Sequence, residues 1–229
     1  MQIAGLTPLT TTDYPGKLAA VVFCQGCPWQ CAYCHNPGLI PRQAEGHIAW
    51  EEIISFLQRR QGLLDGVVFS GGEPTLQSGL GAACQQVRAL GFKTGLHTAG
   101  TYPERLKEWL PLFDWVGMDI KARFGDYEKI SGVPGSGERA SLSLQAVLES
   151  GVDYEIRTTV HPGQITENGI ILLGQELAAL GVQHYVPQAF RAQGCVSSDL
   201  LQLDVKPLSW GTIQAALQPL FQSFSIRGN

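Results

Sequence analysis

The sequence lacks the features that would assign it to a membrane, to secretion or to nucleic acid. No apolar segment approaches the ~20 residues that a helix needs to cross a bilayer. The first five residues lack the charged and apolar regions of a signal peptide. The 16 lysines and arginines do not cluster and the net charge is −4, which argues against nucleic acid as the main partner. We therefore expect a cytoplasmic protein that binds neither membranes nor nucleic acid.

The chain also lacks internal linkers, repeats and low-complexity segments. Its 229 residues are 44% hydrophobic, which is enough to bury a sizeable core. Barrels of ~200–250 residues form single units, so we expect residues 1–229 to form one domain.

Four of the six cysteines lie within eleven residues, from Cys24 to Cys34, directly after an apolar run. Cys27, Cys31 and Cys34 are spaced so that three thiolates of one tight loop can converge on a single metal centre. A structural zinc ion or a fully ligated iron–sulfur cluster takes four protein ligands. Three cysteines can therefore leave one iron open for a substrate or cofactor. Cys24 ends the apolar run, and we expect it to be a buried strand residue.

Two other interpretations of this loop stay open. Cys24 with Cys27 and Cys31 with Cys34 form two pairs that suit a four-cysteine zinc site, although only three residues separate the pairs. Zinc ribbons place ~15–20 residues there. A disulfide framework would need a short, secreted, cysteine-dense chain, and nothing in the sequence indicates secretion.

Short apolar segments alternate with helical stripes along the chain. A possible first strand covers residues 3–6. We then expect strands at residues 18–23, 67–69, 93–97, 115–120, 154–160 and 183–186, and helical stripes within residues 50–57, 80–90, 103–110, 142–148, 170–180 and 213–220. This alternation predicts βαβ units and a parallel sheet. Six units are too few for an eight-stranded barrel, and the ligand site of such a fold lies at the carboxyl ends of the strands.

The predicted strand at residues 67–69 is followed by Ser70-Gly71-Gly72-Glu73-Pro74. Paired glycines allow the backbone to approach a ligand closely and to adopt positive φ. The Glu73 carboxylate can accept hydrogen bonds from an ammonium group. A plain tight turn is the alternative.

The next two strand ends carry further polar side chains. His97 and Thr98 end one strand. Asp119 and Lys121 end the next, and strand alternation points them to the same side. A carboxylate beside an ammonium can meet the polar groups of a cofactor, whereas the alternative is a surface ion pair of little energetic value.

Arg157 lies within the strand at residues 154–160. A buried arginine needs an anionic partner, which is either a ligand carboxylate or an internal acid. Gln188 follows the last predicted strand. Cys84 lies on a helical apolar stripe and is expected in the core, while Cys195 lies in a polar loop where it could be exposed.

The spacing of Cys27, Cys31 and Cys34, with the aromatic Tyr33 before the last cysteine, resembles the signature of the radical S-adenosylmethionine (SAM) enzymes. The resemblance implies a partial (β/α)6 barrel, with these cysteines holding a [4Fe-4S] cluster whose fourth iron binds SAM. It further implies that Gly71, Gly72 and Glu73 contact the SAM amino group and that Tyr33 packs near the adenine. Arg157 becomes a partner for the SAM carboxylate and Gln188 for the ribose.

The flanking residues resemble one group of that superfamily. His35-Asn36-Pro37, Asp119-Ile120-Lys121, the segment at residues 12–17 and the ending at residues 224–228 are similar to the activating proteins of anaerobic ribonucleoside-triphosphate reductases. His35, Thr98, Asp119 and Lys121 thereby join the candidate cofactor contacts. In glycyl-radical activases an acidic residue can precede the threonine, near a monovalent cation; His97 departs from that pattern, which argues against a cation there.

The resemblance also implies a mechanism. An electron from flavodoxin or ferredoxin enters the cluster and then the SAM sulfonium, which yields a 5′-deoxyadenosyl radical. That radical takes a hydrogen from a glycine Cα of the partner reductase. The cofactor carries this chemistry, so no catalytic acid or base is expected.

Three other functions remain open at this point. The first is a radical SAM enzyme that acts on a small molecule, such as a deazapurine precursor. The second is a zinc-binding interaction module, which would carry zinc and no iron. The third is a non-catalytic SAM-binding protein, which would hold the cluster without cleaving SAM.

Overall fold

The structure is a computed structural model that describes residues 1–43 and 47–228. Its strands are β1 (Ile3–Thr10), β2 (Ala19–Cys24), β3 (Gly66–Gly71), β4 (Lys93–Thr98), β5 (Trp115–Asp119), β6 (Asp153–Val160), β7 (His184–Ala189) and β8 (Ser223–Phe224). Its α-helices are α1 (Trp50–Gln58), α2 (Leu80–Ala89), α3 (Pro103–Trp109), α4 (Tyr127–Ser131), α5 (Ser136–Ser150), α6 (Glu167–Ala179), α7 (Ser198–Leu201) and α8 (Trp210–Leu217).

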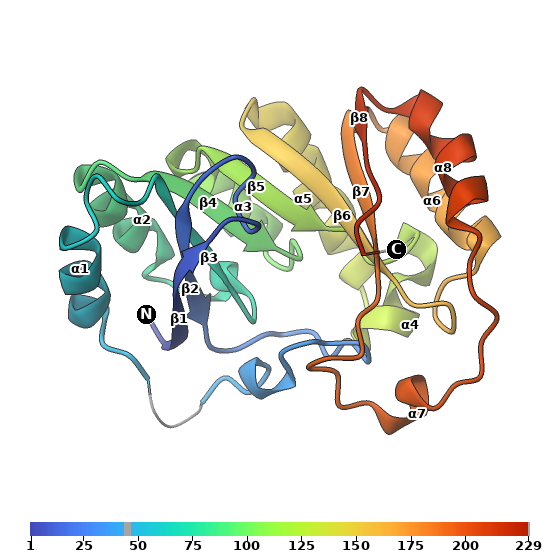
Figure 1. The fold of residues 1–229 in the computed structure, drawn as a ribbon, viewed down its shortest axis with the longest axis horizontal. Coiled ribbons are helices and arrows are strands. Elements are labelled where there is room, and N and C mark those ends of the chain that lie inside the picture. Colours follow the sequence, from blue (N-terminus) through green and yellow to red (C-terminus); the bar gives the residue numbers. More distant parts are fainter. Residues whose placement is uncertain (44–46, 229) are drawn as a thin grey trace.

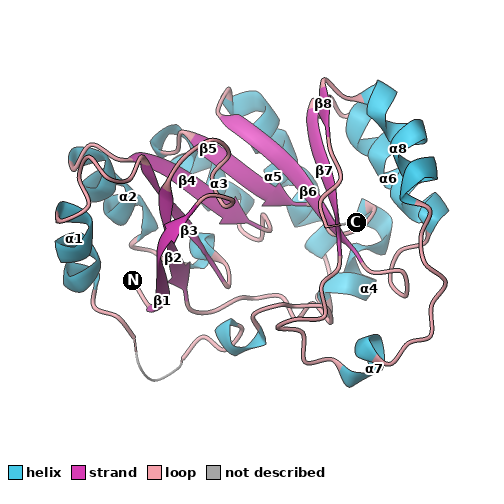
Figure 2. Cartoon of the chain, viewed as in Figure 1, coloured by secondary structure: helices cyan, strands magenta, loops and turns pink. Residues whose placement is uncertain are grey.

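The strands form one sheet in the order of the chain, from β1 to β8 (Figure 1). All neighbours from β2 to β8 pair in parallel, whereas β1 runs antiparallel to β2. The longer helices lie on the outer side of this curved sheet, whereas the short α4 and α7 lie near its lower end in the view of Figure 2. The predicted partial barrel with six parallel strands, β2 to β7, is therefore confirmed. The sequence interpretation missed β8 and the short helices α4 and α7, and it ended the first strand four residues early.

Strand β2 shows why these segments form a buried parallel sheet. Its residues Ala19 to Val22 are at most 1% exposed. Ala20 and Val22 pack with the helix-facing core, while Ala19 and Val21 pack with Tyr14 on the inner side. Because both faces are covered, the strand is continuously apolar rather than alternating.

Tyr14 fills the inner side of the barrel near the start of the strands. Its ring stacks on Trp115 with 5.5 Å between ring centroids. A Cβ on Gly66 would lie 2.9 Å from Lys93 O and 3.1 Å from the ring of Tyr14, so this strand end needs a residue without a side chain. Packing at this end is consistent with a ligand site at the opposite, carboxyl ends of the strands.

Candidate functional site

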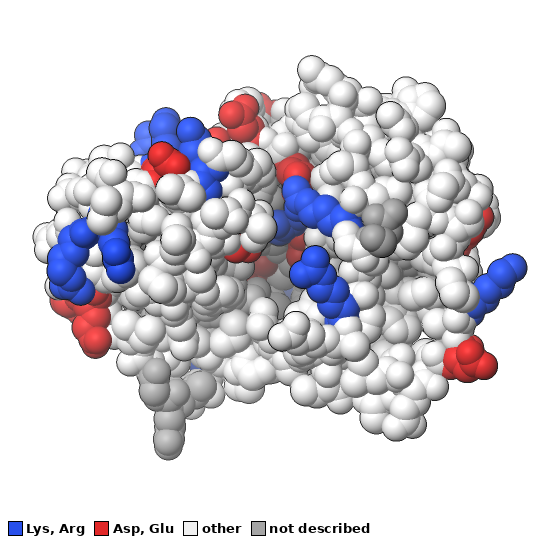
Figure 3. Space-filling model, viewed as in Figure 1, with Lys and Arg blue, Asp and Glu red and all other residues white. Residues whose placement is uncertain are grey.

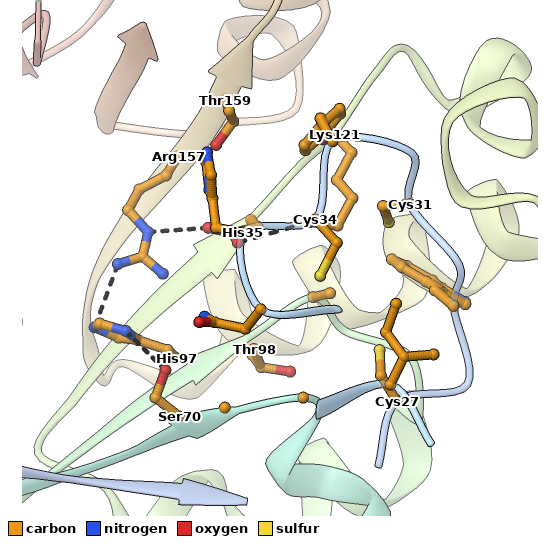
Figure 4. Close-up of a pocket in the computed structure, with 18 of the residues that line it drawn as sticks. Cys27, Cys31, Cys34, His35, Ser70, His97, Thr98, Lys121, Arg157 and Thr159 are labelled. Atoms are coloured by element: carbon orange, nitrogen blue, oxygen red, sulfur yellow. Dashed lines mark hydrogen bonds and ion pairs between the residues drawn. The ribbon is translucent and has the colours of Figure 1, made fainter. Parts of the chain in front are cut away.

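A cavity of about 200 Å³ lies at the carboxyl ends of the strands, as expected for this fold (Figure 4). Residues from the cysteine loop (24–37) and from the ends of β3 to β7 form its wall. They are Cys27, Trp29, Cys31, Tyr33, Cys34, His35, Asn36, Ile40, Ser70, Gly71, Gly72, His97, Thr98, Ala99, Asp119, Lys121, Arg157, Thr159 and Gln188. All sequence-predicted site residues except Glu73 therefore line one cavity.

Backbone hydrogen bonds fix the cysteine loop against its neighbours. Gly26 N donates to Leu39 O at 2.8 Å and Cys27 N donates to Ile40 O at 3.0 Å. On the other side, Glu73 N donates to Gly26 O at 2.8 Å. The loop therefore has backbone partners on both flanks and presents its thiols from a defined backbone.

The thiols of Cys27, Cys31 and Cys34 are half-buried on the cavity wall. Burial, and after it the nearby charge of Glu73, raises the pKa of Cys27 to about 12. Burial also raises the pKa of Cys31. Thiolates at these positions therefore need bound metal to stabilise them.

The three thiols are not arranged to hold a single metal ion. Among the described residues, no three His, Cys, Asp or Glu side chains gather closely enough to hold one ion. A single zinc ion binds each thiolate at ~2.3 Å, which brings the sulfur atoms within ~4–5 Å of one another. A four-iron cluster is larger and takes cysteines from wider positions. The four-cysteine zinc site gains no support, because Cys24 is fully buried in β2 and absent from the cavity wall.

The two glycines at the end of β3, Gly71 and Gly72, are required by the cysteine loop itself. A Cβ on Gly72 would overlap the carbonyl oxygen of Gly26 and lie 2.8 Å from Leu39 O. Gly71 has a φ of +112°, and a Cβ there would overlap the backbone of Cys24. The sequence interpretation explained these glycines by close approach to a ligand; the structure adds that they allow two protein segments to pack.

Glu73 has a different place from the other candidates. Its side chain is 0% exposed and does not line the cavity. Its Oε1 accepts hydrogen bonds from Thr75 N, Thr75 Oγ1 and Thr98 Oγ1 at 3.0, 2.7 and 2.8 Å, and its Oε2 accepts from Ala99 N at 2.9 Å. The carboxylate thereby joins the segment after β3 to the segment after β4.

We expect Glu73→Ala to destabilise the protein by about 2–4 kcal/mol, because it leaves the buried Thr98 hydroxyl and Ala99 N–H without an acceptor. Glu73→Gln should cost less, since its carbonyl oxygen still accepts from two threonines. Urea unfolding of the protein without cofactors measures both. Glu108→Gln on the exposed face of α3 is the matched control and should have little effect. Unchanged stability of Glu73→Ala, with SAM affinity lost, would instead assign the carboxylate to the cofactor.

Asp119, Arg157 and His97 form a network on the cavity wall. Figure 4 shows Arg157 and His97 next to each other. Arg157 Nε donates to Asp119 Oδ1 at 3.0 Å and its Nη2 donates to Gly117 O at 3.2 Å. Burial alone would raise the pKa of the Asp119 carboxyl, but the charges of Arg157 and Lys121 outweigh it and hold this pKa below its ordinary value. The internal salt bridge considered for Arg157 is therefore present.

His97 stays neutral in this network. Burial, and after it the charge of Arg157, lowers the pKa of His97 to about 3. Its Nε2 lies 2.8 Å from Asp13 O, which can only accept, so Nε2 carries the proton. Arg157 Nη1 lies 3.3 Å from the same Nε2. Because Nε2 carries a proton, it cannot accept a hydrogen bond from Arg157 Nη1. This guanidinium nitrogen is available to an anion in the cavity.

Lys121 and Tyr33 lie together beside the thiols. The Lys121 ammonium is 3.7 Å from Asp119 Oδ2 and 5.6 Å from the centre of the Tyr33 ring. The predicted same-side arrangement of Asp119 and Lys121 is therefore confirmed. Thr98 lies on the adjacent wall, where its hydroxyl is used by Glu73.

The segment that follows β7 packs on the cysteine loop. His35 stacks on Phe190 at 5.4 Å, and His35 Nε2 lies 2.9 Å from Arg191 O. Cys195 is only 8% exposed, so the prediction that it could be exposed is wrong; its Sγ lies 3.8 Å from Ala32 O. A Cβ on Gly194 would overlap His35 O, so this contact is tight.

The remaining predictions concern Gln188, Cys24 and Cys84. Gln188 lines the cavity and donates to Thr159 Oγ1 at 2.9 Å. Cys24 and Cys84 are both 0% exposed, which confirms that they are core residues.

Sequence reasoning did not identify several residues of the cavity wall, including Trp29, Ser70 and Thr159. Trp29 Nε1 and Tyr33 OH are buried and have no hydrogen-bond partner among the described residues. Trp29 was detectable, because it stands between two of the cysteines. Ser70 and Thr159 carry no comparable signal, because isolated hydroxyls at strand ends are common.

None of the helices in the described ranges is long and apolar enough to span a membrane.

An open parallel barrel with three thiols, a glycine pair and an arginine–aspartate network at its carboxyl end defines an enzyme that binds a metal cluster beside a small charged cofactor. Residues 21–168 match the radical SAM superfamily, and the chain belongs to this superfamily. Its enzymes use a [4Fe-4S] cluster and SAM, and these are the cofactors of this chain. The predicted superfamily is thus confirmed.

Similar proteins support this membership. A protein of Methanocaldococcus jannaschii, named among the glycyl-radical enzyme activating enzymes, is 34% identical over 178 residues, which are 73% of this chain and 72% of that protein. The pyruvate formate-lyase-activating enzyme of Clostridium pasteurianum is 34% identical over 167 residues, 70% of this chain and 69% of that enzyme.

A solved structure shares the fold. Streptococcus suis SuiB bound to S-adenosylmethionine superposes with a TM-score of 0.67 at 14% identity. The superposition covers 89% of this chain and 48% of SuiB, so the chain spans about half the length of that protein.

Proposed function

We propose that this chain activates a glycyl-radical enzyme, and that its partner is an anaerobic ribonucleoside-triphosphate reductase. One cavity that joins three thiols to a cradle for a charged cofactor supports radical SAM chemistry. The observation that carries the activase assignment is the similarity to two relatives named as activating enzymes, each 34% identical. The particular reductase rests on the motifs at residues 12–17, 35–37, 119–121 and 224–228.

In this proposal Cys27, Cys31 and Cys34 ligate the cluster. The SAM site is formed by Tyr33, His35, Gly71, Gly72, Thr98, Asp119, Lys121, Arg157 and Gln188, all of which line the cavity. Glu73 contributes through Thr98 and Ala99 rather than by facing the cavity. When bound, the cluster and SAM supply one-electron cleavage of a carbon–sulfur bond and thereby a carbon-centred radical.

The chain's own residues bind and orient the cofactor and exclude water. Arg157 Nη1 and the Lys121 ammonium offer two donors for the SAM carboxylate, and charge-assisted hydrogen bonds of this kind are strong and directional. The neutral His97 imidazole fills the position beside Arg157 without adding charge. The buried aromatic rings of Trp29 and Tyr33 close the wall next to the thiols, which keeps water from a reactive radical.

The open side of the sheet provides access for a protein partner. The strand order runs from β1 to β8 without returning to β1 in the described part of the chain. A loop of a large enzyme can therefore enter where a closed barrel would exclude it. We further propose that flavodoxin or ferredoxin supplies the electron and that the protein works in the cytoplasm.

The function is tested by anaerobic reconstitution with iron and sulfide, followed by reduction in the presence of SAM. We expect 5′-deoxyadenosine to form, and a glycyl radical signal to appear by electron paramagnetic resonance when the reductase is added. 5′-Deoxyadenosine without any glycyl radical would contradict the activase and favour a small-molecule substrate, such as a deazapurine precursor. Bound zinc with no SAM cleavage would contradict both.

A further inference from the structure

A second cavity, of about 350 Å³, adjoins the cofactor cavity on its outer side. The two share His35, His97, Asp119, Arg157, Thr159 and Gln188. The outer cavity adds Thr12, Asp13, Ala189, Arg191 and Arg227. A group held in the outer cavity therefore lies next to the cofactor site.

The lining of the outer cavity has one more positive than negative side chain, although the protein carries a net charge of −4. Three arginines line it against two aspartates. Basic side chains flank the hollow in the middle of the face shown in Figure 3. Because field lines concentrate in a cavity, such a site attracts an anion even on an acidic protein.

The sheet brings Arg191 and Arg227 together from distant parts of the chain. The backbone of Arg227 forms a parallel β-bridge with Gln188 of β7, and Ala189 N donates to Arg227 O at 2.8 Å. A Cβ on Gly228 would lie 3.7 Å from both Nε and Nη2 of Arg191. Both arginines line the cavity, and the Arg191 side chain lies against the residue that follows Arg227.

The acidic groups of the cavity already have partners. Asp119 is held by Arg157 and Lys121, and Asp13 Oδ2 accepts from Thr10 Oγ1 at 2.5 Å. Arg227 pairs with Glu155 at 2.7 Å. Among the described residues, Arg191 makes no ion pair, and its side chain is exposed. It is therefore the cation of this cavity that remains available to an incoming anion.

We propose that Arg191, which lines the same cavity as Arg227, binds an aspartate or glutamate side chain of the partner segment that enters the cavity. This inference rests on the proposed function and adds the chemistry by which the partner is recognised. Guanidinium groups match carboxylates through two parallel hydrogen bonds, which gives direction as well as affinity. The carboxylate would anchor the segment in the outer cavity while a neighbouring residue reaches the cofactor.

Two synthetic peptides test this recognition without the partner. Each is a glycine pentapeptide, acetylated and amidated at its ends, with a central glutamate in one and a central glutamine in the other. Binding to the reconstituted enzyme with SAM is measured by calorimetry. We expect the glutamate peptide to bind about tenfold more tightly, a preference that Arg191→Glu abolishes. Arg191 O, which contacts His35, is backbone and is kept in this variant.

Arg59→Glu is the matched control, because it makes the same change of charge at the exposed end of α1 and outside the cavity. It should keep the preference for glutamate. Equal binding of the two peptides to the wild-type enzyme would overturn the inference. The inference would also be overturned if Arg191→Glu lost as much affinity for SAM as for the glutamate peptide, because the guanidinium would then serve the cofactor.

Titration of the reductase in parallel separates this inference from the proposed function. A glutamate preference that depends on Arg191, without any binding of the reductase, would contradict the proposed partner and support the carboxylate site. Binding of the reductase that Arg191→Glu leaves unchanged would support the partner and overturn the site.

Discussion

Replacing Cys27, Cys31 or Cys34 by alanine will abolish cluster assembly, so that bound iron falls from about four atoms per chain to near zero. Each of these thiols lies on the cavity wall and has no disulfide partner. A three-cysteine site has no spare protein ligand, because SAM takes the fourth iron. The loss of one thiolate should therefore be sufficient. Iron and sulfide analysis after anaerobic reconstitution, with the visible absorption of the cluster, measures the outcome.

Cys84→Ala is the control for this series. Cys84 is 0% exposed on α2, where its Sγ lies 3.1 Å from Leu112 O, far from the cavity wall. This variant should keep the full iron content, at a modest cost in stability for the lost packing. Retention of the cluster in all three ligand variants would refute the assignment of the ligands. Retention of the cluster in only one variant would mean that the cysteine replaced there is not a ligand and that another group binds the iron.

The fold was largely predictable because of burial on both faces of the sheet. Strands such as β2 and β3 are continuously apolar, and a buried parallel sheet is one of the few arrangements that such runs permit. The short strand at the edge of the sheet was less predictable, because it lacks such a continuous apolar run. Strand β8 is only two residues long, and its Ser223 and Phe224 carry no periodic signal.

The candidate site was predictable where the chemistry is local in sequence. The three cysteines are close together in the chain, and their spacing alone indicates a metal centre. The network of His97, Asp119 and Arg157 depends on three strands, and no spacing in the sequence encodes the distances between their side chains. The same holds for Arg191 and Arg227, which the pairing of the C-terminal segment with β7 brings together.

Glu73 illustrates how a motif can be located correctly while the role of its side chain stays open. Its position next to the glycine pair made it a candidate for contact with the cofactor. The structure places the carboxylate behind the wall, where it accepts four hydrogen bonds from two protein segments. Since buried carboxylates are strongly destabilising without such partners, its stabilising role is visible only in three dimensions.

Gly72→Ala should weaken both the fold and the binding of the cluster, although the change adds one methyl group. Gly72 has no positive φ, so alanine is acceptable to the backbone and the effect arises from contact alone. The added Cβ would overlap Gly26 O, which already accepts from Glu73 N at 2.8 Å. Because these contacts involve backbone atoms, no side-chain rotation can relieve them. The cysteine loop must shift, at a cost of about 1–3 kcal/mol.

Gly38→Ala provides the comparison, because a Cβ at Gly38 meets nothing within 4 Å and the residue also lies close to the cysteine loop. We expect its stability to remain within about 0.5 kcal/mol of the wild type. Urea unfolding of the protein without cofactors and the rate of iron loss to a chelator measure the two effects separately. If Gly72→Ala is destabilised and also loses iron faster, the glycine pair sets the position of the thiols. If both properties match those of Gly38→Ala, the close packing of β3 against the cysteine loop does not determine cluster binding.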